Sequence, residues 1–307
     1  MFELAYRIYF RRLGTKRLDD LCQDIKIRIL NILLPVYFGL TGFISSYKLQ
    51  KTPNNKELLI VSLTSFPTRI SKVWLAVETL LRQKVKPDKI ILWLFNGEFK
   101  GKESLPKNLL KLEERGLEIR FCSENLMPHL KYFYTMLEFP EANIITVDDD
   151  IYYPPDLIEN LKYWHKIYPE SIICAITRQI LVLEGEIRPY KEWNYLHINT
   201  KPSFRNLTMG VGGTLYPKGS LHCNVFDVDV LKRLVLKTDD LWLKVMSLKN
   251  NTRIVSIAGE YSRFFIPIIF KNNLSLMDVN ITGGNNDIVF KNLLEYFKIN
   301  ILDIEKE

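Results

Sequence analysis

The stretch Asn143-Ile-Ile-Thr-Val-Asp-Asp-Asp150 decides the fold class predicted for this chain. Residues 144–147 are apolar or β-branched, which is typical of a short buried strand. The carboxylates of Asp148, Asp149 and Asp150 follow where such a strand leaves its sheet. Adjacent carboxylates repel one another unless a cation lies between them, and Mg²⁺ or Mn²⁺ commonly bridges carboxylates to a phosphate. The stretch therefore predicts a divalent-cation site at a strand end. The alternative is a solvated acidic turn before a helix that begins near Asp156.

Strand and helix patterns alternate on both sides of this stretch. The predicted strands are 58–63, 89–94, 118–121, 144–147 and 171–176, and the predicted helices are 71–82, 106–115, 129–138 and 156–168. This alternation predicts βαβ units and a mainly parallel central sheet with helices on both faces, an α/β fold. Ligands bind at the carboxyl ends of the strands in such sheets. The polar residues Thr64 and Ser65 at the end of the first strand are therefore expected near the three aspartates.

Length, charge and cysteine usage narrow the class of protein. The 307 residues are 47% hydrophobic, which is enough for a sizeable core in one large domain or two fused halves. The net charge of +7 suits phosphate-bearing ligands or an anionic membrane. We expect no nucleic-acid partner, because no basic stripe with interleaved aromatic residues occurs. The four cysteines lack zinc spacing and predict free thiols in the cytoplasm.

The N-terminal segment, residues 1–50, differs from the rest of the chain. Residues 1–28 carry seven basic side chains, and residues 29–47 carry no charge. Three alternatives remain open for this segment: a basic segment lying on an anionic cytoplasmic leaflet, a helix packed on the catalytic domain or on a partner, and a membrane span.

Several residues in the second half are candidates for chemistry. Asp239 and Asp240 follow Thr238, a good N-cap, and either carboxylate could serve as a general base, although two acids at a helix start also have a structural explanation. Asp287 has the same two interpretations. Trp193, Tyr195, Tyr216 and Trp242 could stack on a sugar ring or belong to the core.

Basic residues, a histidine and glycines supply further candidates. Arg69 and Lys131 lie near the predicted strand ends and could contact a diphosphate, or they could be solvated surface residues. His129 could be a metal ligand or a hydrogen-bond donor to a phosphate, or it could be a plain histidine at a helix start. The cluster Gly210, Gly212 and Gly213 lacks a dinucleotide fingerprint, so these glycines allow a close backbone approach or form a turn.

Taken together, five segments resemble bacterial GT-A glycosyltransferases that build capsule, lipopolysaccharide or other surface polysaccharide. They are Ser62-Leu-Thr-Ser-Phe-Pro-Thr-Arg69, Lys86-Pro-Asp-Lys-Ile-Ile-Leu-Trp93, Val147-Asp-Asp-Asp150, Gly210-Val-Gly-Gly213 with Leu215-Tyr-Pro217, and Thr238-Asp-Asp-Leu-Trp242. The resemblance covers roughly residues 57–300. It implies a GT-A-like catalytic domain over 57–300, with a nucleotide-binding half at 57–150 and an acceptor-binding half at 151–300. The chain has Asp-Asp where the common inverting pattern has Glu-Asp, and it lacks the usual Gln-x-x-Arg-Trp motif.

The resemblance also implies roles for individual residues. Asp148 and Asp150 would hold Mn²⁺ or Mg²⁺ and the nucleotide diphosphate. The expected nucleotide-sugar site also contains Thr64, Ser65, Arg69, Lys131 and Asp149. Asp240 is the favoured catalytic base, with Asp239 close behind it. The expected acceptor site contains Trp193, Gly212, Gly213, Trp242 and Asp287.

The implied function is metal-dependent transfer of a sugar from a nucleotide-diphosphate donor, with a UDP-sugar favoured, to a saccharide or lipid-linked saccharide acceptor. The expected location is cytoplasmic and peripheral, on the inner face of the cytoplasmic membrane. Two alternatives remain: a metal-dependent phosphoesterase, which predicts further His or Asp ligands for a two-metal site, and a non-catalytic scaffold subunit that keeps a glycosyltransferase fold.

Overall fold

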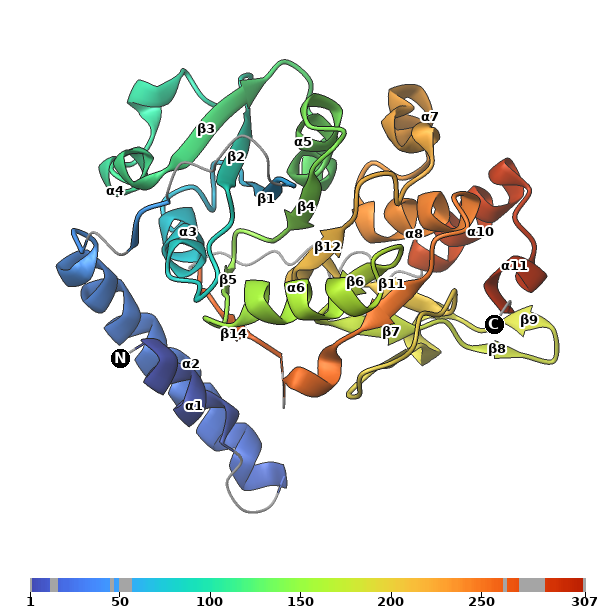
Figure 1. Cartoon of the computed structure of the whole chain (residues 1–307), viewed down its shortest axis with the longest axis horizontal. Helices are drawn as coiled ribbons and strands as arrows, with labels where there is room; N and C mark the ends of the chain where they lie inside the picture. The colour runs from blue at the N-terminus through green and yellow to red at the C-terminus, as the bar shows by residue number, and fades with distance from the viewer. Residues whose placement is uncertain are drawn as a thin grey trace.

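The fold is organised around a seven-stranded sheet, seen in a computed structural model that describes residues 2–11, 16–44, 47–49, 57–261, 264–270 and 285–305. The strand order is β13-β6-β12-β4-β1-β2-β3 (Figure 1). These strands are β1 (Leu59–Thr64), β2 (Lys89–Phe95), β3 (Leu117–Cys122), β4 (Asn143–Thr146), β6 (Ile172–Cys174), β12 (Thr214–Tyr216) and β13 (Ile254–Ser256). All neighbouring pairs are parallel except those of β12, which runs antiparallel to β4 and β6. The predicted α/β fold with a mainly parallel central sheet is confirmed.

The central strands are buried on both faces, which is why they read as continuous β-branched runs. Ile60 of β1 contributes to the core on one face and Val61 to the core on the other. The first face is covered by α5 (Phe133–Glu138), α7 (Val228–Leu234), α8 (Asp239–Lys249) and α10 (Asn285–Phe297), and the second by α3 (Val73–Leu81), α4 (Lys107–Leu110) and α6 (Leu157–Ile167). The chain ends in α11 (Ile301–Glu305). Helices therefore lie on both faces of the sheet, as predicted.

Two predicted helices are shorter and interrupted. The 106–115 segment forms α4 and then a 3₁₀ turn, Glu113–Arg115, because Gly116 adopts φ 107° and directs the chain into β3. The 129–138 segment begins as a 3₁₀ helix, Met127–Lys131, and continues as α5 only after a break at Tyr132. The break lies where His129 and Tyr132 turn into the core and bond to each other at 2.9 Å, from Nδ1 to the phenol oxygen.

Small antiparallel elements, which the sequence did not predict, lie in the second half. A three-stranded sheet has the order β10 (Asn194–Tyr195), β7 (Thr177–Gln179) and β11 (Asn206–Thr208). Two further pairs join β8 (Val182–Leu183) to β9 (Glu186–Ile187), and β5 (Ile151–Tyr152) to β14 (Ile266–Pro267). The predicted loop residues 282–284 lie outside the described residues.

The N-terminal segment forms two helices, α1 (Phe2–Phe10) and α2 (Lys16–Thr41), which lie side by side at one edge of the molecule (Figure 1). Phe2, Tyr6, Leu34 and Phe38 join a separate apolar cluster that also contains residues of α3, β5 and β14. One face of the pair therefore packs on the sheet-bearing part of the chain. Among the described helices, none combines the length and the apolar character needed to cross a bilayer.

Candidate active site

A cavity of about 500 Å³ lies at the carboxyl ends of β1 and β4 and at the start of α8. Nine of the predicted site residues line it: Thr64, Ser65, Arg69, Lys131, Asp148, Asp149, Asp150, Asp239 and Asp240. The position agrees with the general rule that ligands of such sheets bind where the strands end. The cavity thus brings together side chains from both halves of the chain.

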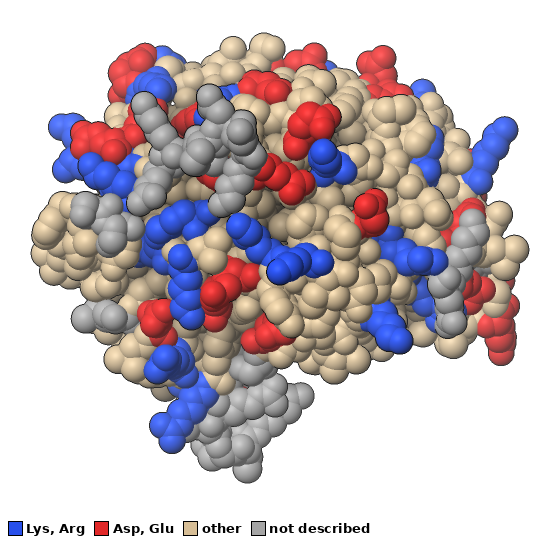
Figure 2. Space-filling view, viewed as in Figure 1, with Lys and Arg blue, Asp and Glu red and all other residues tan. Residues whose placement is uncertain are grey.

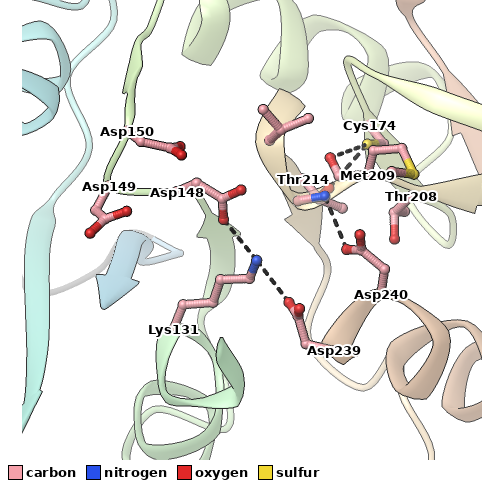
Figure 3. Close-up of polar contacts among 12 residues, drawn as sticks. Lys131, Asp148, Asp149, Asp150, Cys174, Thr208, Met209, Thr214, Asp239 and Asp240 are labelled. Carbon is pink, nitrogen blue, oxygen red and sulfur yellow. Dashed lines mark hydrogen bonds and ion pairs between the residues drawn. The ribbon is translucent and has the colours of Figure 1, made fainter. Parts of the chain in front are cut away.

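The three consecutive aspartates do not point the same way. Figure 3 shows Asp148 and Asp150 directed to one side and Asp149 to the other, where the chain leaves β4 and turns at residues 149–150. Asp149 is buried; its Oδ2 accepts a hydrogen bond from Ser65 Oγ at 2.5 Å, and its Oδ1 lies 2.9 Å from Arg69 Nη1. Asp149 therefore holds the first-strand loop in place. Asp148 and Asp150 keep part of their side-chain surface in the cavity, at 29% and 28% exposed.

Arg69 and mutual repulsion set the charge of this acidic run. Arg69 Nη1 lies 2.7 Å from Asp150 Oδ2 as well as contacting Asp149. Burial, followed by the neighbouring charge of Asp148, raises the pKa of Asp150 to about 7, and Arg69 only partly opposes this rise. Burial and like charge therefore outweigh the contact of Arg69 at Asp150.

Lys131 connects the acidic run to the acidic pair of α8. Its Nζ lies 2.8 Å from Asp148 Oδ1 and 2.7 Å from Asp239 Oδ2 (Figure 3), and the whole residue is 4% exposed. Burial lowers the pKa of Lys131, but the attraction of Asp148, Asp239 and Asp240 outweighs burial and raises the pKa well above its usual value. Lys131 is therefore a buried, permanently charged bridge between two carboxylates that come from distant parts of the sequence.

The two acids of α8 differ in charge state. Burial alone would raise the pKa of Asp239, but Lys131 lowers it below its usual value. Burial and the charge of Asp239 raise the pKa of Asp240 to about 8, and Asp240 Oδ1 accepts a hydrogen bond from the backbone N–H of Gly210 at 3.0 Å. Thr238 occupies the N-cap position, but its side chain makes no capping hydrogen bond, so the predicted cap bond is absent. One ionised carboxylate and one carboxyl group with a pKa near neutrality thus lie side by side, a pattern found where acid–base roles are divided.

Gly210 is a position of close approach. A Cβ atom at this residue would lie 2.4 Å from Lys131 Nζ, 3.3 Å from Asp240 Oδ1 and 3.4 Å from Asp148 Oδ1. A side chain at residue 210 would therefore force the ammonium group of Lys131 to move from its bridging position. Of the two roles that the sequence left open for Gly210, close approach is the one observed.

The donor set suits a hard divalent cation that also binds phosphate. Mg²⁺ usually takes one or two protein carboxylates and completes its coordination with substrate phosphates and water. Asp148 and Asp150 supply two such carboxylates with partly exposed oxygens on one side of the backbone. In the part of the chain that the structure describes, no group of three or more His, Cys, Asp or Glu side chains forms a metal cage. Asp148 and Asp150 are thus the residues here that could hold such a cation, with substrate phosphate and water as its further ligands.

The five remaining predicted residues lie outside the cavity lining. Trp193 is 3% exposed and donates its Nε1–H to Arg188 O, and Trp242 is fully buried and donates to Val225 O. Gly212 gives close approach to the backbone of Ile176, and Gly213 adopts φ 79° before β12. These are packing and turn positions in the structure.

Asp287 and His129 also have structural partners. Asp287 Oδ1 accepts a hydrogen bond from Tyr190 N at 2.6 Å. His129 is fully buried, with Nδ1 bonded to Tyr132 and Nε2 3.0 Å from Val235 O, and burial lowers its pKa to about 4. Neither ring nitrogen of His129 is free for a ligand.

The structure adds cavity residues that the sequence did not single out as such. They are Phe66, Glu98, Asn125, Met127, Pro128, Leu130, Val147, Tyr190, Met209, Val211, Lys237, Leu241 and Asn286. Tyr190 and Tyr195 flank the guanidinium of Arg178, whose Cζ lies 4.7 Å and 4.2 Å from the two ring centroids. The aromatic stretch 189–195 is the sequence signal for this wall, and of the two residues predicted there to stack on a sugar, Tyr195 lines the cavity and Trp193 does not.

Comparison with known proteins gives structural matches only. No protein-family model and no curated protein matches the sequence. Among solved structures 149 chains match. TarS of S. aureus (1–349) in complex with UDP-GlcNAc has a TM-score of 0.49 and 10% identity, over 82% of this chain and 68% of that chain. Mannosyltransferase PcManGT from Pyrobaculum calidifontis, in complex with GDP-Man and Mn²⁺, has a TM-score of 0.39 and 12% identity, over 76% and 67%.

A synthase also matches. The 4-diphosphocytidyl-2C-methyl-D-erythritol synthase of Anaerococcus prevotii has a TM-score of 0.42 and 14% identity, over 75% of this chain and 98% of that chain. In another TarS 1–349 structure the match covers 58% of that chain, and in a longer TarS chain it covers 35%. The chain thus spans less than two thirds of those two. All of these TM-scores are below 0.5, so the function is inferred below from the side chains of the cavity.

Proposed function

We propose that the chain is a metal-dependent glycosyltransferase that moves a sugar from a nucleotide-diphosphate donor to a saccharide or lipid-linked saccharide acceptor. The proposal rests on two features that occur in one cavity. One is a pair of carboxylates of the kind that binds a divalent cation, and the other is a carboxyl group whose pKa is near neutrality. Asp148 and Asp150 form the pair and Asp240 is the carboxyl group, and Lys131 bridges Asp148 to Asp239, the neighbour of Asp240. A transferase of this kind needs a cation that neutralises the charge of the diphosphate and a general base that takes the proton of the acceptor hydroxyl.

At the donor end, Asp148 and Asp150 would hold Mn²⁺ or Mg²⁺. When bound, such a cation neutralises the charge of a departing diphosphate. Asp149 positions the loop after β1 through Ser65 and Arg69, and Thr64 and Ser65 border the same space. Arg69 brings a guanidinium to this end, where a planar fork suits phosphate oxygens.

At the acceptor end, Asp240 takes the proton from the acceptor hydroxyl. The hydroxyl oxygen then forms a bond to the anomeric carbon of the donor sugar. The bond from that carbon to the diphosphate breaks, and the electron pair leaves with the nucleoside diphosphate. A base with a pKa of about 8 is well matched to this role, because it is a stronger proton acceptor than an ordinary carboxylate and still ionises near neutral pH. Asp239 stays ionised beside Lys131 and holds it in place.

The described residues disfavour one of the two alternative functions, the metal-dependent phosphoesterase. A two-metal phosphoesterase needs further His or Asp ligands, whereas His129 is buried with both nitrogens bonded and the described residues contain no three-ligand group. The scaffold alternative makes a separate prediction, namely that replacing Asp150 causes no loss of function.

Isothermal titration of the purified chain with UDP-, GDP- and CMP-linked sugars, with and without Mn²⁺, tests the proposal. We compare wild type with Asp150→Ala and with the control Asp229→Ala, an exposed carboxylate on α7. We expect Mn²⁺-dependent binding of one nucleotide class, lost in Asp150→Ala and kept in the control, and transfer of the donor sugar to acceptor in the same preparations. A folded wild-type protein that binds no nucleotide would refute the assignment and favour the scaffold.

The peripheral location at the inner face of the cytoplasmic membrane remains part of the proposal. A lipid-linked acceptor would bring the enzyme to a membrane surface. The net charge of +7 is compatible with an anionic leaflet.

A further inference from the structure

The N-terminal helices expose an unusual amount of apolar surface. Of the 21 large hydrophobic side chains that are exposed among the described residues, ten lie between Leu4 and Ile44 and eleven in all the rest of the chain. Scattered exposed hydrophobic residues are normal on soluble proteins, but a contiguous group indicates an interaction surface.

Most of this group forms one stripe along α2. We call it the α2 apolar face: Ile29, Ile32, Leu33, Val36, Leu40 and Phe43, with exposed fractions from 48% for Ile29 to 82% for Phe43. Its members within the helix fall in an arc of about 100°, at 3.6 residues per turn. Leu30, Leu34 and Phe38 are buried on the opposite side, in the cluster shared with α3. This half of α2 is therefore apolar on two faces, of which only one is covered.

We infer that the α2 apolar face docks on an anionic lipid surface, with α2 lying in the plane of the interface. The inference does not depend on the proposed catalytic function. An interfacial helix combines an apolar face with basic residues at headgroup level. Residues 1–28 carry seven basic and four acidic side chains, and Arg7, Arg11 and Arg28 are exposed. On the face drawn in Figure 2, basic side chains lie among acidic ones at the lower left, where Figure 1 places the α1–α2 pair, and the C-terminal half of α2 has no charged residue.

Two other occupants fit less well. A bilayer crossing is disfavoured because no described helix is long and apolar enough. A second copy packed as a coiled coil would use a narrow seam with flanking charges that fix the register. Here the stripe is wide, and residues 29–47 carry no charge to serve that purpose. A broad uncharged stripe that begins beside basic residues matches a flat anionic surface best.

Vesicle flotation of the full chain tests the inference. The vesicles are phosphatidylcholine with or without phosphatidylglycerol, and the variant is Ile32→Ser/Val36→Ser/Leu40→Ser. The matched control is Leu137→Ser/Leu183→Ser/Ile198→Ser, three exposed aliphatic side chains outside α2. Circular dichroism and thermal melting verify that each protein is folded.

We expect wild type and control to float with anionic vesicles, and the α2 variant to lose at least about tenfold in partition coefficient, since three buried side chains are removed from the interface. Binding should weaken as salt is raised, because part of the attraction is screened. A folded α2 variant that floats as well as wild type would overturn the inference. So would a wild type that does not float, and light scattering would then show whether a dimer lost in the α2 variant accounts for the face.

Discussion

Replacing Lys131 by methionine removes the buried charge between Asp148 and Asp239 while keeping the side-chain volume similar. In the wild type, Nζ lies 2.8 Å and 2.7 Å from the two carboxylates, and Lys131 is 4% exposed. In the variant both carboxylates lose this partner, and Asp239 is only 8% exposed to solvent. The fold should therefore become less stable at neutral pH.

The size of the effect follows from the cost of an unpaired buried charge, about 3–5 kcal/mol. Asp148 is partly hydrated, with its side chain 29% exposed, so we expect the lower half of that range. Unfolding 307 residues carries an entropy of about 0.64 kcal/mol/K at roughly 2.1 cal/mol/K per residue, so the melting temperature should fall by about 5–6 °C.

The pH dependence identifies the cause. Lys131 lowers the pKa of Asp239 in the folded protein, so this pair stabilises the fold above the unfolded pKa of about 4 and loses its effect as the pH falls. The stability difference between wild type and variant should be largest near neutrality and shrink in acid, where the carboxylates of the variant become protonated.

Differential scanning calorimetry at neutral and acidic pH measures both quantities. Lys102→Met is the control, because the Lys102–Glu113 pair is largely exposed and such pairs contribute little. Mn²⁺ should stabilise Lys131→Met more than wild type, because the cation can neutralise the carboxylate of Asp148 that has lost its lysine partner. A variant as stable as wild type at neutral pH, or one whose deficit does not change with pH, would refute the bridging role of Lys131.

Three further predictions concern the same region and the helix behind it. Asp240→Asn should abolish sugar transfer. The pKa of Asp240 is about 8 in the folded protein and lower in the unfolded chain, so the wild-type fold loses stability as the pH rises between about 4 and 8. Thermal scans should therefore show that the variant becomes more stable relative to wild type at alkaline pH. Lys244→Met should stabilise the fold by up to about 4 kcal/mol at or below neutral pH and by less near pH ~10, as measured by urea unfolding. Burial lowers the pKa of Lys244 to about 7 in the folded protein, against ~10.4 in the unfolded chain, so protonation of this lysine disfavours the native state. Gly210→Ala should weaken metal-dependent nucleotide binding and cost about 1–3 kcal/mol in stability, because its Cβ would lie 2.4 Å from Lys131 Nζ; unchanged titrations would contradict the close-approach role.

The sequence predicts the first half of the fold well for a physical reason. Strands β1, β2 and β4 are buried on both faces, so each is a continuous apolar run with polar residues where it ends. The carboxyl ends of parallel strands lie on one edge of the sheet, and this rule alone places Thr64, Ser65 and the three aspartates together.

The second half depends on contacts that no local pattern encodes. Strand β12 has three residues, follows a glycine cluster and runs antiparallel between two strands that come earlier in the chain. Tyr190 and Tyr195 reach the cavity while Trp193, between them, packs on Phe290 in the core. Near the start of α10, Asn286 lines the cavity and Asp287 bonds to Tyr190 N. Residue type correctly suggests a functional wall in both segments, but the rotation of the backbone decides which neighbour faces the ligand.

The charge of the cavity links the proposed cation to the proposed donor. Six carboxyl groups line it, those of Glu98, Asp148, Asp149, Asp150, Asp239 and Asp240, against three basic groups, those of Arg69, Lys131 and Lys237. A diphosphate is itself an anion, so entry into this cavity is electrostatically unfavourable unless positive charge is added or carboxylates are neutralised. Burial raises the pKa values of Asp150 and Asp240, and the deficit of positive charge beside their neighbouring carboxylates adds to the rise. A divalent cation at Asp148 and Asp150 would both relieve that deficit and attract the diphosphate. For this reason we expect nucleotide affinity to depend on the cation, and loss of Asp150 to weaken binding when Mn²⁺ is present but not when it is absent.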